Sequence, residues 1–344
     1  MNFIGKHKVL TSVFIVIVAL VILVTGTASY FLGKINITDR NTSLEPATVA
    51  AGEEISDLSD SEKKAFEDAD GKIKDNLDNS KTWRSDDVMN IALLGIDYGD
   101  EKYPYGRSDA MIILSINKAV KKINVISLSR TVYSAIPGYQ NTRMNHAHGY
   151  AGAPLALKTI ELNYKFAIDN YISCGFDSFM KIIDILGGVD IDLSQAEVDA
   201  LKKRRPDLFE KAGRYTLDGD AALRYARLRY IDSDQNRTGR QRKVVMSIMK
   251  KMKNISFSQA TEIIDKVLPL VSTDFKKSEI MYQIVSAIKY LKWDTHQYFM
   301  PSKTYKLVMR DWFEVTLIDW PYEVKYLHDI MFEGVTPEYK ELEK

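Results

Sequence analysis

A long uncharged run of hydrophobic residues stands near the start of the chain. Leu10–Leu32 holds 23 residues, none of which is charged. As a helix this run would be roughly 34 Å long, enough to cross a hydrocarbon core of roughly 30 Å. A cleaved signal peptide is the alternative, but its apolar core runs only about 7–15 residues. The pattern predicts an uncleaved transmembrane helix at residues 10–32, after a short cytoplasmic segment, residues 1–9.

The charges that flank this run indicate how it crosses the membrane. Lys6, Lys8 and the terminal amine precede it, whereas Lys34 and Arg40 follow it. This slight excess of positive charge on the N-terminal side favours a cytoplasmic N-terminus. We therefore expect a single-pass protein of the cell membrane, with nearly all of the remaining chain outside the cytoplasm.

The next segment, residues 33–85, is polar and acidic and has few aromatic residues. Residues 41–80 hold 11 acids and 4 lysines, a net charge of −7, whereas the whole chain carries +1. The segment could form a solvent-facing helix, but it offers little apolar surface to bury. The composition therefore predicts an acidic spacer that holds the following domain away from the membrane.

From residue 86 onward, strand patterns alternate with helix patterns. Met89–Asp97 and Asp109–Asn117 are apolar runs bounded by turn residues, which is typical of strands buried on both faces, and Lys122–Ser129 alternates. The stretch DSFMKIIDILGG has helical periodicity and ends on two glycines, and DGDAALRYARLRY opens with Asp218 as a helix N-cap. The alternation predicts one α/β/α domain with a central mixed sheet over residues 86–344.

Composition and common motifs narrow the functional classes. Hydrophobic residues make up 45% of the chain and charged residues 27%, so the composition is that of an ordinary globular protein. Cys174 is the single cysteine and cannot form an internal disulfide. The chain has no Walker A loop, GxSxG elbow, HExxH or CxxC pair. His146 and His148 would share a face on a strand and could bind a metal, whereas in a loop they would be surface residues.

Two aspartates stand at the facing ends of consecutive predicted strands. Asp97 ends the first strand, and Asp109 begins the next, with Arg107 just before it. A return of the chain would bring both carboxylates to one end of the sheet, where ligands often bind in α/β folds. Facing carboxylates repel unless a cation lies between them, and their hard oxygens suit Mg²⁺. The alternative is that both residues only shape turns.

Arginines are concentrated in one short stretch. Tyr225–Lys243 holds five arginines and one lysine against two aspartates, and Arg130 follows another predicted strand. Arginine binds phosphate through two parallel hydrogen bonds and stays charged in apolar surroundings. Three interpretations stay open for this stretch: a solvated helix face, a nucleic-acid patch or a clamp on several phosphates.

These motifs resemble, in order and spacing, those of the LytR–CpsA–Psr family of membrane-anchored bacterial cell-wall ligases. The matching segments lie between residues 88 and 332, and they include NIALLGID, GRSDAMIILSIN, ISLSR, DNYISCGFDSFMKIIDILGGVDIDL, LDGDAALRYARLRY and RTGRQRKVV. The resemblance implies a single N-terminal helix, an outward catalytic domain and a long apolar pocket for a lipid tail.

The resemblance also implies a reaction. Enzymes of this family are phosphotransferases that move a glycopolymer from a polyprenyl-pyrophosphate carrier to peptidoglycan, at the 6-hydroxyl of N-acetylmuramic acid. A wall hydroxyl would attack the sugar-side phosphorus and polyprenyl phosphate would leave, while Mg²⁺ and arginines neutralise the developing charge. The implied partners are the lipid-linked glycopolymer, peptidoglycan and the cell membrane, and not nucleic acid.

The positions of the family motifs imply the site residues. Asp97 and Asp109 would hold Mg²⁺ or Mn²⁺, and with Arg130 they form the implied catalytic set. The implied pyrophosphate-binding residues are Arg107, Arg130, Arg227, Arg229, Arg237, Arg240 and Gln241.

The chain also departs from the family pattern. Tyr98 and Gly99 stand where the family often has arginine, and residues 143–147 read RMNHA where it usually has KINAA. Ser129 and Thr131 flank Arg130 where the family usually has proline and aspartate. Thr131 can orient Arg130 only through a neutral hydroxyl, so we expect these changes to bear on substrate fit and turnover.

Two other functions fit parts of the pattern. One is a membrane-bound regulatory or DNA-binding protein, which would use the basic stretch and act in the cytoplasm. The other is a polyprenyl-pyrophosphate binder or phosphatase that transfers nothing. Topology discriminates the first from a cell-wall ligase, and dependence on an acceptor discriminates the second.

Overall fold

The computed structural model describes residues 36–37, 58–78, 81–206, 208–228, 231–276, 286, 289–303, 306–310 and 313–341. The predicted membrane helix at residues 10–32 and most of the predicted spacer before residue 58 lie outside these ranges. Within them, no helix is both long enough and apolar enough to span a membrane.

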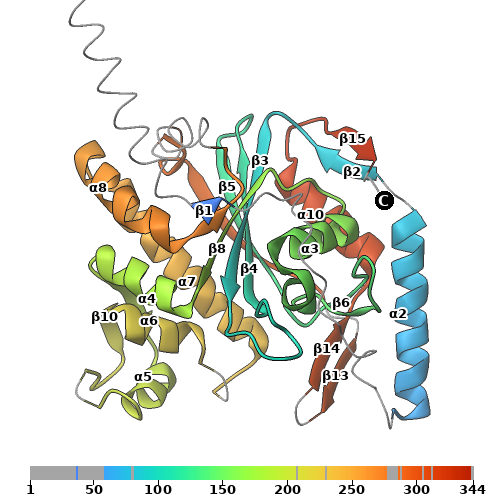
Figure 1. Cartoon of the computed structure of the whole chain (residues 1–344), viewed down its shortest axis with the longest axis horizontal. Coiled ribbons are helices and arrows are strands. Elements are labelled where there is room, and N and C mark those ends of the chain that lie inside the picture. Colours follow the sequence, from blue (N-terminus) through green and yellow to red (C-terminus); the bar gives the residue numbers. More distant parts are fainter. Residues whose placement is uncertain are drawn as a thin grey trace, which may run out of the picture.

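A mixed sheet of seven described strands forms the centre of the fold (Figure 1). In spatial order its strands are β1 (Asn36–Ile37), β11 (Ser272–Thr273), β8 (Asn170–Gly175), β3 (Val88–Ile96), β4 (Ser108–Asn117), β5 (Lys122–Leu128) and β12 (Asp294–Met300). The β3–β4 and β4–β5 pairs are antiparallel, whereas β3–β8 and β5–β12 are parallel. The prediction of an α/β domain with a central mixed sheet is confirmed.

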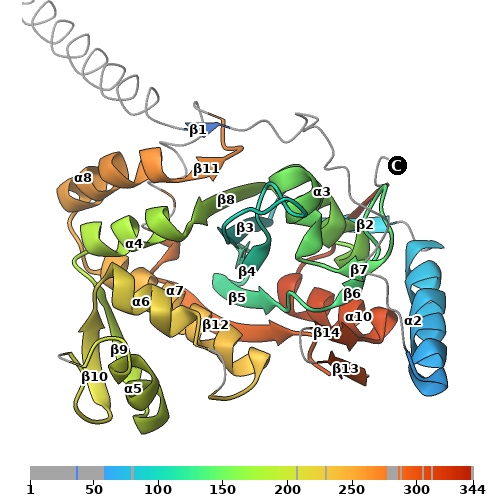
Figure 2. The same cartoon turned by 60° about the horizontal axis from the view of Figure 1, so that its bottom comes forward.

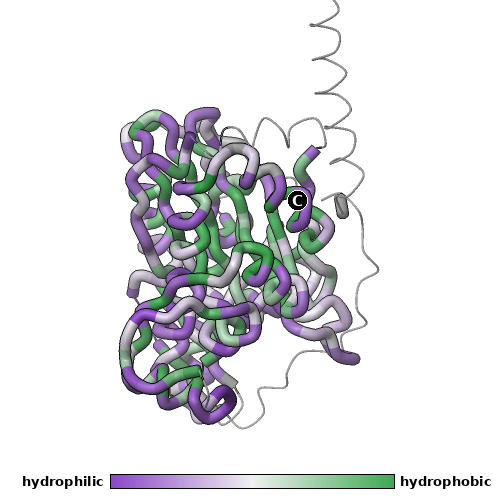
Figure 3. Tube along the Cα trace, turned by 90° about the vertical axis from the view of Figure 1, so that its left-hand side faces the viewer, coloured by the Kyte–Doolittle hydropathy of each residue, from purple (hydrophilic) through white to green (hydrophobic). Residues whose placement is uncertain are grey.

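Helices cover both faces of this sheet (Figure 2). One face packs on α3 (His146–Tyr164) and α10 (Trp320–Met331), with α2 (Asp60–Asp78) outside them. The other faces α7 (Asp234–Lys253), α4 (Phe176–Ile185) and α8 (Phe257–Val267). Alternate residues of a strand point to opposite faces, so each strand contributes apolar side chains to both layers. Figure 3 shows these hydrophobic strands at the centre and hydrophilic segments around them.

Smaller elements surround the three layers. The hairpin β9 (Val189–Leu193)–β10 (Gly213–Leu217) forms a second apolar cluster with α5 (Gln195–Lys202), α6 (Gly219–Ala226) and one side of α7. The remaining described elements are β2 (Lys81–Arg84), β6 (Tyr133–Ser134), β7 (Thr142–Arg143), the 3₁₀ turn η1 (Leu268–Leu270), β13 (Lys306–Arg310), β14 (Phe313–Leu317) and β15 (Glu338–Glu341).

Helix α2 lies within the segment that the sequence pattern predicts as a spacer. It buries Ala65, Phe66, Ala69 and Ile73 in the same core as α3 and α10. Four apolar residues at helical spacing suffice for one buried stripe, even though the rest of the helix is charged. Together with β1, which pairs with β11 in the central sheet, α2 shows that the fold includes segments before the predicted boundary at residue 86.

Candidate active site

The connection between β3 and β4 brings Asp97, Arg107 and Asp109 to one end of the sheet. The two strands are antiparallel, and the Asp97 amide donates a hydrogen bond to the Arg107 carbonyl at 3.0 Å. Gly106 in this connection has a φ of +69°, and a Cβ there would lie 2.3 Å from the Asp97 carbonyl oxygen. Only glycine fits this turn, so the return of the chain is fixed by local geometry.

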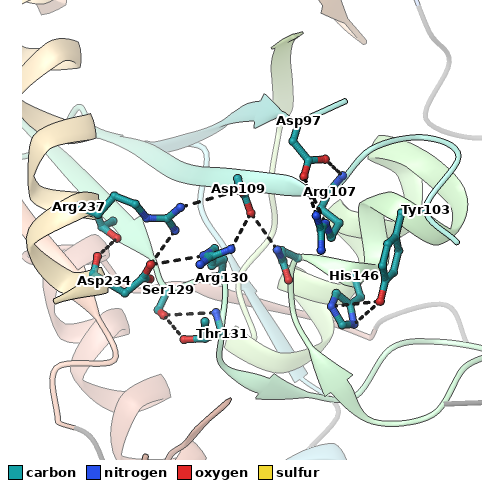
Figure 4. A network of polar contacts seen from close by, with 12 residues as sticks. Asp97, Tyr103, Arg107, Asp109, Ser129, Arg130, Thr131, His146, Asp234 and Arg237 are labelled. Atoms are coloured by element: carbon teal, nitrogen blue, oxygen red, sulfur yellow. Dashed lines mark hydrogen bonds and ion pairs between the residues drawn. The ribbon is translucent and has the colours of Figure 1, made fainter. Parts of the chain in front are cut away.

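Asp97 is held by Arg107 (Figure 4). The Arg107 side chain donates from Nε at 3.3 Å and from Nη2 at 3.1 Å to Asp97 Oδ2, and its backbone amide donates to Oδ1. Burial raises the pKa of the Asp97 carboxyl, Arg107 opposes this, and the charge of Asp109 adds to the rise. Asp97 thus lies close enough to Asp109 to sense its charge.

Asp109 accepts hydrogen bonds from two elements. Its Oδ1 accepts from Arg130 Nη1 at 3.0 Å and from Asn145 Nδ2 at 3.2 Å. Its Oδ2 lies 3.8 Å from Arg237 Nη1. The Asp109 carboxylate is therefore the centre of the polar network in Figure 4.

Arg130 and Arg237 converge on a second carboxylate, Asp234. Its Oδ1 lies 2.9 Å from Arg237 Nη2 and 3.4 Å from Arg130 Nε. Burial lowers the pKa of Arg130, but the carboxylates of Asp109 and Asp234 more than offset this and raise it. The Arg237 side chain is only 3% exposed. Both guanidiniums therefore stay charged in a desolvated setting, where a phosphate contact is strongest.

The first turn of α7 supplies Asp234 and Arg237. The side chain of Ser233 caps this helix by accepting from the Asn236 amide. Backbone amides at a helix N-terminus are free of intrahelical partners and favour anions. The α7 N-terminus and the ends of β3 and β5 thus meet at one place, where the sequence predicts a phosphate site.

Other residues of the basic stretch lie elsewhere. Both terminal nitrogens of Arg240 bind the Asp232 carboxylate at 2.7 Å, and one also donates to the Leu228 carbonyl. Arg240 therefore fixes the loop before α7 instead of facing Asp109. The exposed Arg227 stacks over the Phe176 ring at 4.3 Å.

Two predicted ligands remain to be placed. Gln241 lies at the edge of the cluster, where its Nε2 donates to the Asp109 carbonyl at 3.5 Å. Arg229 lies outside the described residues, so its predicted role stays a prediction.

Residues that depart from the family pattern form hydrogen bonds with neighbouring side chains. Thr131 Oγ1 forms hydrogen bonds with Ser129 Oγ at 3.0 Å and with Thr316 Oγ1 at 2.9 Å. This chain of hydroxyls ties the backbone around Arg130 to β14. Tyr98, exposed at the end of β3, donates to Asp177 Oδ1 at 3.0 Å.

The two neighbouring histidines are buried in the fold. His148 Nδ1 donates to the Gly106 carbonyl at 2.8 Å, and burial lowers the His148 pKa to about 4. Burial lowers the His146 pKa to about 2, and its ring packs on Tyr103. In the described part of the chain, no group of three or more His, Cys, Asp or Glu side chains could hold a metal. Both histidines are therefore neutral packing residues that support the β3–β4 connection and α3.

Sequence reasoning missed three residues of this site. Asn145 belongs to the RMNHA segment, and Asp234 is one of the two aspartates of the basic stretch, to which the pattern assigns no role. Glu314 comes from β14, and the charges of Asp234, Arg130 and Arg237 all act on its carboxyl. Only the pairing of distant segments reveals these positions, although the acid between two arginine pairs was a usable signal for Asp234.

The sheet face toward α7 is covered less completely than the opposite face. Ile91, Leu93 and Leu114 stay half-buried there, as does Ile172, which pairs with Leu93 across β3 and β8. On the opposite face, Ala92 and Leu94 are fully buried in the main core. A strip of accessible apolar side chains therefore runs along β3 toward the end where Asp97 stands.

The site combines two features. Arginines and carboxylates at the strand ends can bind an anion and a cation, and the apolar strip beside them can contact a hydrocarbon chain. Such a combination suits an amphipathic ligand with a polyanionic head.

Comparison with known proteins supports this interpretation. Residues 51–308 match the model of the LytR_cpsA_psr family. A polyisoprenyl-teichoic acid–peptidoglycan teichoic acid transferase, TagU of Enterococcus faecalis, is 32% identical over 225 residues, which cover 63% of this chain and 70% of that protein. TagT of Bacillus subtilis, named for the same activity, is 33% identical over 175 residues, which cover 49% and 54%. The chain thus spans between about half and two thirds of the length of most such relatives.

Solved structures share the fold. TagT with bound octaprenyl pyrophosphate lipid superposes with a TM-score of 0.56 at 23% identity and covers 72% of this chain and 91% of its own. TagT bound to LIIa-WTA gives a TM-score of 0.60 at 24% identity, with coverages of 72% and 90%. At this identity the similarity establishes a common architecture.

Proposed function

The chain belongs to the LytR_cpsA_psr family, and from this we propose that it transfers a glycopolymer from a polyprenyl-pyrophosphate carrier to peptidoglycan, forming a phosphodiester link. The observation that carries the proposal is the convergence of Arg130 and Arg237 beside an apolar strip on the same sheet. A lipid pyrophosphate has the matching parts, a charged head and a hydrocarbon tail. The relatives named as teichoic acid transferases make teichoic acid the first donor to test.

The arginines would act through charge and geometry. The oxygens of a pyrophosphate would replace the carboxylates as partners of Arg130 and Arg237. Arg107 would bind the pyrophosphate from the opposite side. Charge that develops on the equatorial oxygens in the transition state then meets preorganised guanidiniums. In related phosphoryl transfers, one such arginine contributes roughly 10³–10⁵ in rate.

Mg²⁺ or Mn²⁺ fits the donor set at this end of the sheet. Asp97 and Asp109 offer hard oxygens. Burial raises the Asp97 pKa and the charge of Asp109 adds to the rise, a repulsion that a cation would relieve. Mg²⁺ in proteins commonly takes one or two carboxylates and completes its shell with water and substrate phosphate. Asp97 and Asp109 would hold the ion, and when bound it would supply positive charge beside the pyrophosphate.

Removal of the Asp109 carboxylate should separate the Mg²⁺ dependence of turnover from the binding of the lipid. We expect Asp109→Asn to abolish Mg²⁺-dependent turnover, because the amide oxygen is a weaker ligand without charge, while lipid affinity changes less. Turnover titrated with Mg²⁺ and with EDTA measures this, and Asp190→Asn, an exposed partner of Arg214, is the control. An Asp109→Asn enzyme with the metal dependence of wild type would contradict the assignment.

We propose the same topology that the sequence predicts. A helix at residues 10–32 would anchor the protein in the cell membrane with the catalytic domain outside the cytoplasm, where peptidoglycan lies. A reporter enzyme that works only outside the cytoplasm should be active when it is fused after Lys344. A reporter active in the cytoplasm would rule out this arrangement.

The geometry weighs against nucleic acid as the ligand. Within the basic stretch, Arg240 is 3% exposed and binds the Asp232 carboxylate, so it offers no accessible charge to a nucleic-acid backbone. The proposed topology also places this stretch outside the cytoplasm, away from nucleic acid.

A phosphatase without transfer remains the second candidate, because the same residues would bind its substrate. Release of polyprenyl phosphate measured with and without added peptidoglycan tests the choice. Release that depends on peptidoglycan supports a transferase, and equal release without it would favour hydrolysis.

A further inference from the structure

We propose that Glu314 is the general base that takes the proton of the acceptor hydroxyl, an assignment that rests on the proposed transfer reaction. Glu314 stands on β14, beyond residue 308, where the match to the family model ends. Nothing in the sequence motifs points to it.

The β13–β14 hairpin aims Glu314 at the site. Alternate residues of a strand point to opposite sides. Val315 and Leu317 lie in the main core, so Glu314 and Thr316 point the other way. Thr316 is fixed to the segment around Arg130 by two bonds to Thr131, one between the hydroxyls and one from the Thr316 amide to the Thr131 carbonyl, both 2.9 Å.

The charges around Glu314 come from three separate elements. Arg130 follows β5, Arg143 lies on β7, and Asp234 and Arg237 lie on α7. Burial raises the pKa of the Glu314 carboxyl, the charge of Asp234 adds to the rise, and the three arginines oppose it, with a net rise. A carboxylate whose pKa is raised toward the working pH is a better proton acceptor.

Glu314 also differs from the other carboxylates of the site in its contacts. Asp97, Asp109 and Asp234 each bind at least one arginine, so their carboxylate oxygens already have charged partners. Among the described residues, the Glu314 side chain forms no hydrogen bond or ion pair, and the residue is half-buried. Within the described part of the site, its carboxylate oxygens are therefore not engaged by an arginine and can accept a proton.

The acceptor O–H bond breaks and its proton passes to a Glu314 carboxylate oxygen, while the acceptor oxygen forms a bond to the sugar-side phosphorus. The bond from that phosphorus to the bridging oxygen breaks, and polyprenyl phosphate leaves with the electron pair. Glu314 then releases its proton to water and returns to the ionised form.

The test measures kcat, KM and the pH profile of transfer for wild type, Glu314→Gln and Glu314→Asp, together with calorimetric affinity for a short-chain polyprenyl pyrophosphate. We expect Glu314→Gln to lower kcat by about 10²–10⁴-fold and to keep the lipid affinity. In wild type, the transfer rate should fall as pH falls through the raised pKa of Glu314. This decline at low pH, the acid limb of the profile, should be absent in Glu314→Gln. Glu314→Asp keeps a carboxylate and should keep the limb. Glu333→Gln, on the surface beside Lys122, is the matched control.

Chemical rescue covers the case in which Glu314→Gln folds poorly. Formate should restore part of the transfer rate to Glu314→Ala, which a purely structural role would not allow. If wild type transfers but Glu314→Gln keeps its rate or its acid limb, or formate rescues nothing, the general-base assignment falls and the transfer reaction stands. If wild type itself transfers nothing with donor, acceptor and Mg²⁺ present, the proposed function and this assignment both fall.

Discussion

Arg130 and Arg237 each contact the carboxylates of Asp109 and Asp234, and a bound pyrophosphate would have to compete with both. Asp109 and Asp234 keep the guanidiniums charged, oriented and close together before any substrate arrives. This arrangement lowers the reorganisation needed on binding, at the cost of contacts that must be exchanged. The planar fork of arginine is essential here, because each guanidinium reaches two acceptors at once.

Replacement of Arg237 by lysine tests this geometry. An ammonium carries the charge but cannot bridge Asp109 and Asp234, and one charge-assisted bond to phosphate contributes about 1.5–3 kcal/mol. We expect Arg237→Lys to bind a short-chain polyprenyl pyrophosphate roughly ten- to a hundredfold more weakly in calorimetry, and Arg229→Lys to behave alike if it shares the clamp. Arg214→Lys, in an exposed pair with Asp190, should bind as wild type does. Equal affinity of all three variants, each folded, would show that the cluster is no clamp.

The buried His148 gives the protein a defined pH response. Its pKa is lowered from 6.5 to about 4 in the folded state, because burial disfavours the charged ring. Between these values the unfolded chain binds a proton that the folded chain does not, so stability falls as pH falls, at up to about 1.4 kcal/mol per pH unit. We expect denaturant unfolding of His148→Gln to show a shallower pH slope below pH 6.5. His296→Gln, at an exposed position, should keep the wild-type slope, and an unchanged slope in His148→Gln would contradict this role.

Among the elements, the strands that frame the site were predictable and their partners were not. The apolar runs ending at Asp97 and beginning at Asp109 match β3 and β4 within one residue, because turn residues bound them. The order in which strands pair, and the approach of β14 to Arg130, depend on contacts between segments far apart in sequence. Helix α2 was hidden for another reason: its charged positions outnumber the four apolar residues that anchor it. The local sequence could not show whether the Arg240 guanidinium would bind Asp232 or a ligand.

Helix α2 should contribute directly to stability. Phe66 is 6% exposed and packs edge-on against Tyr133 at 5.1 Å between ring centroids. Removal of such a ring leaves a cavity, so Phe66→Ala should lower the free energy of unfolding by about 3–5 kcal/mol. Glu67→Ala, exposed on the same helix, should change it little. Equal stability of the two variants in urea would mean that α2 is only a spacer, as its composition suggests.

At the scale of the whole molecule, the two faces of the sheet have different tasks. The face toward α3 and α10 is a closed core that holds the strands in place. The face toward α7 buries Ile112 and Val125 against that helix but leaves Ile91 and Leu93 of β3 half-buried on the side of the charged end. The arginines belong to segments that meet only when the sheet and α7 pack together. The site therefore exists only in the folded domain, and each half of it matches one half of an amphipathic pyrophosphate.

The most direct measurement follows the phosphorus itself. A lipid-linked glycopolymer carrying ³²P at the sugar-side phosphorus is incubated with the protein, Mg²⁺ and peptidoglycan, and the label is traced after muramidase digestion. We predict that the label moves into peptidoglycan fragments as a phosphodiester, while unlabelled polyprenyl phosphate is released in equal amount. Label that stays on the lipid, or that appears as a soluble glycan phosphate, would contradict the proposed transfer.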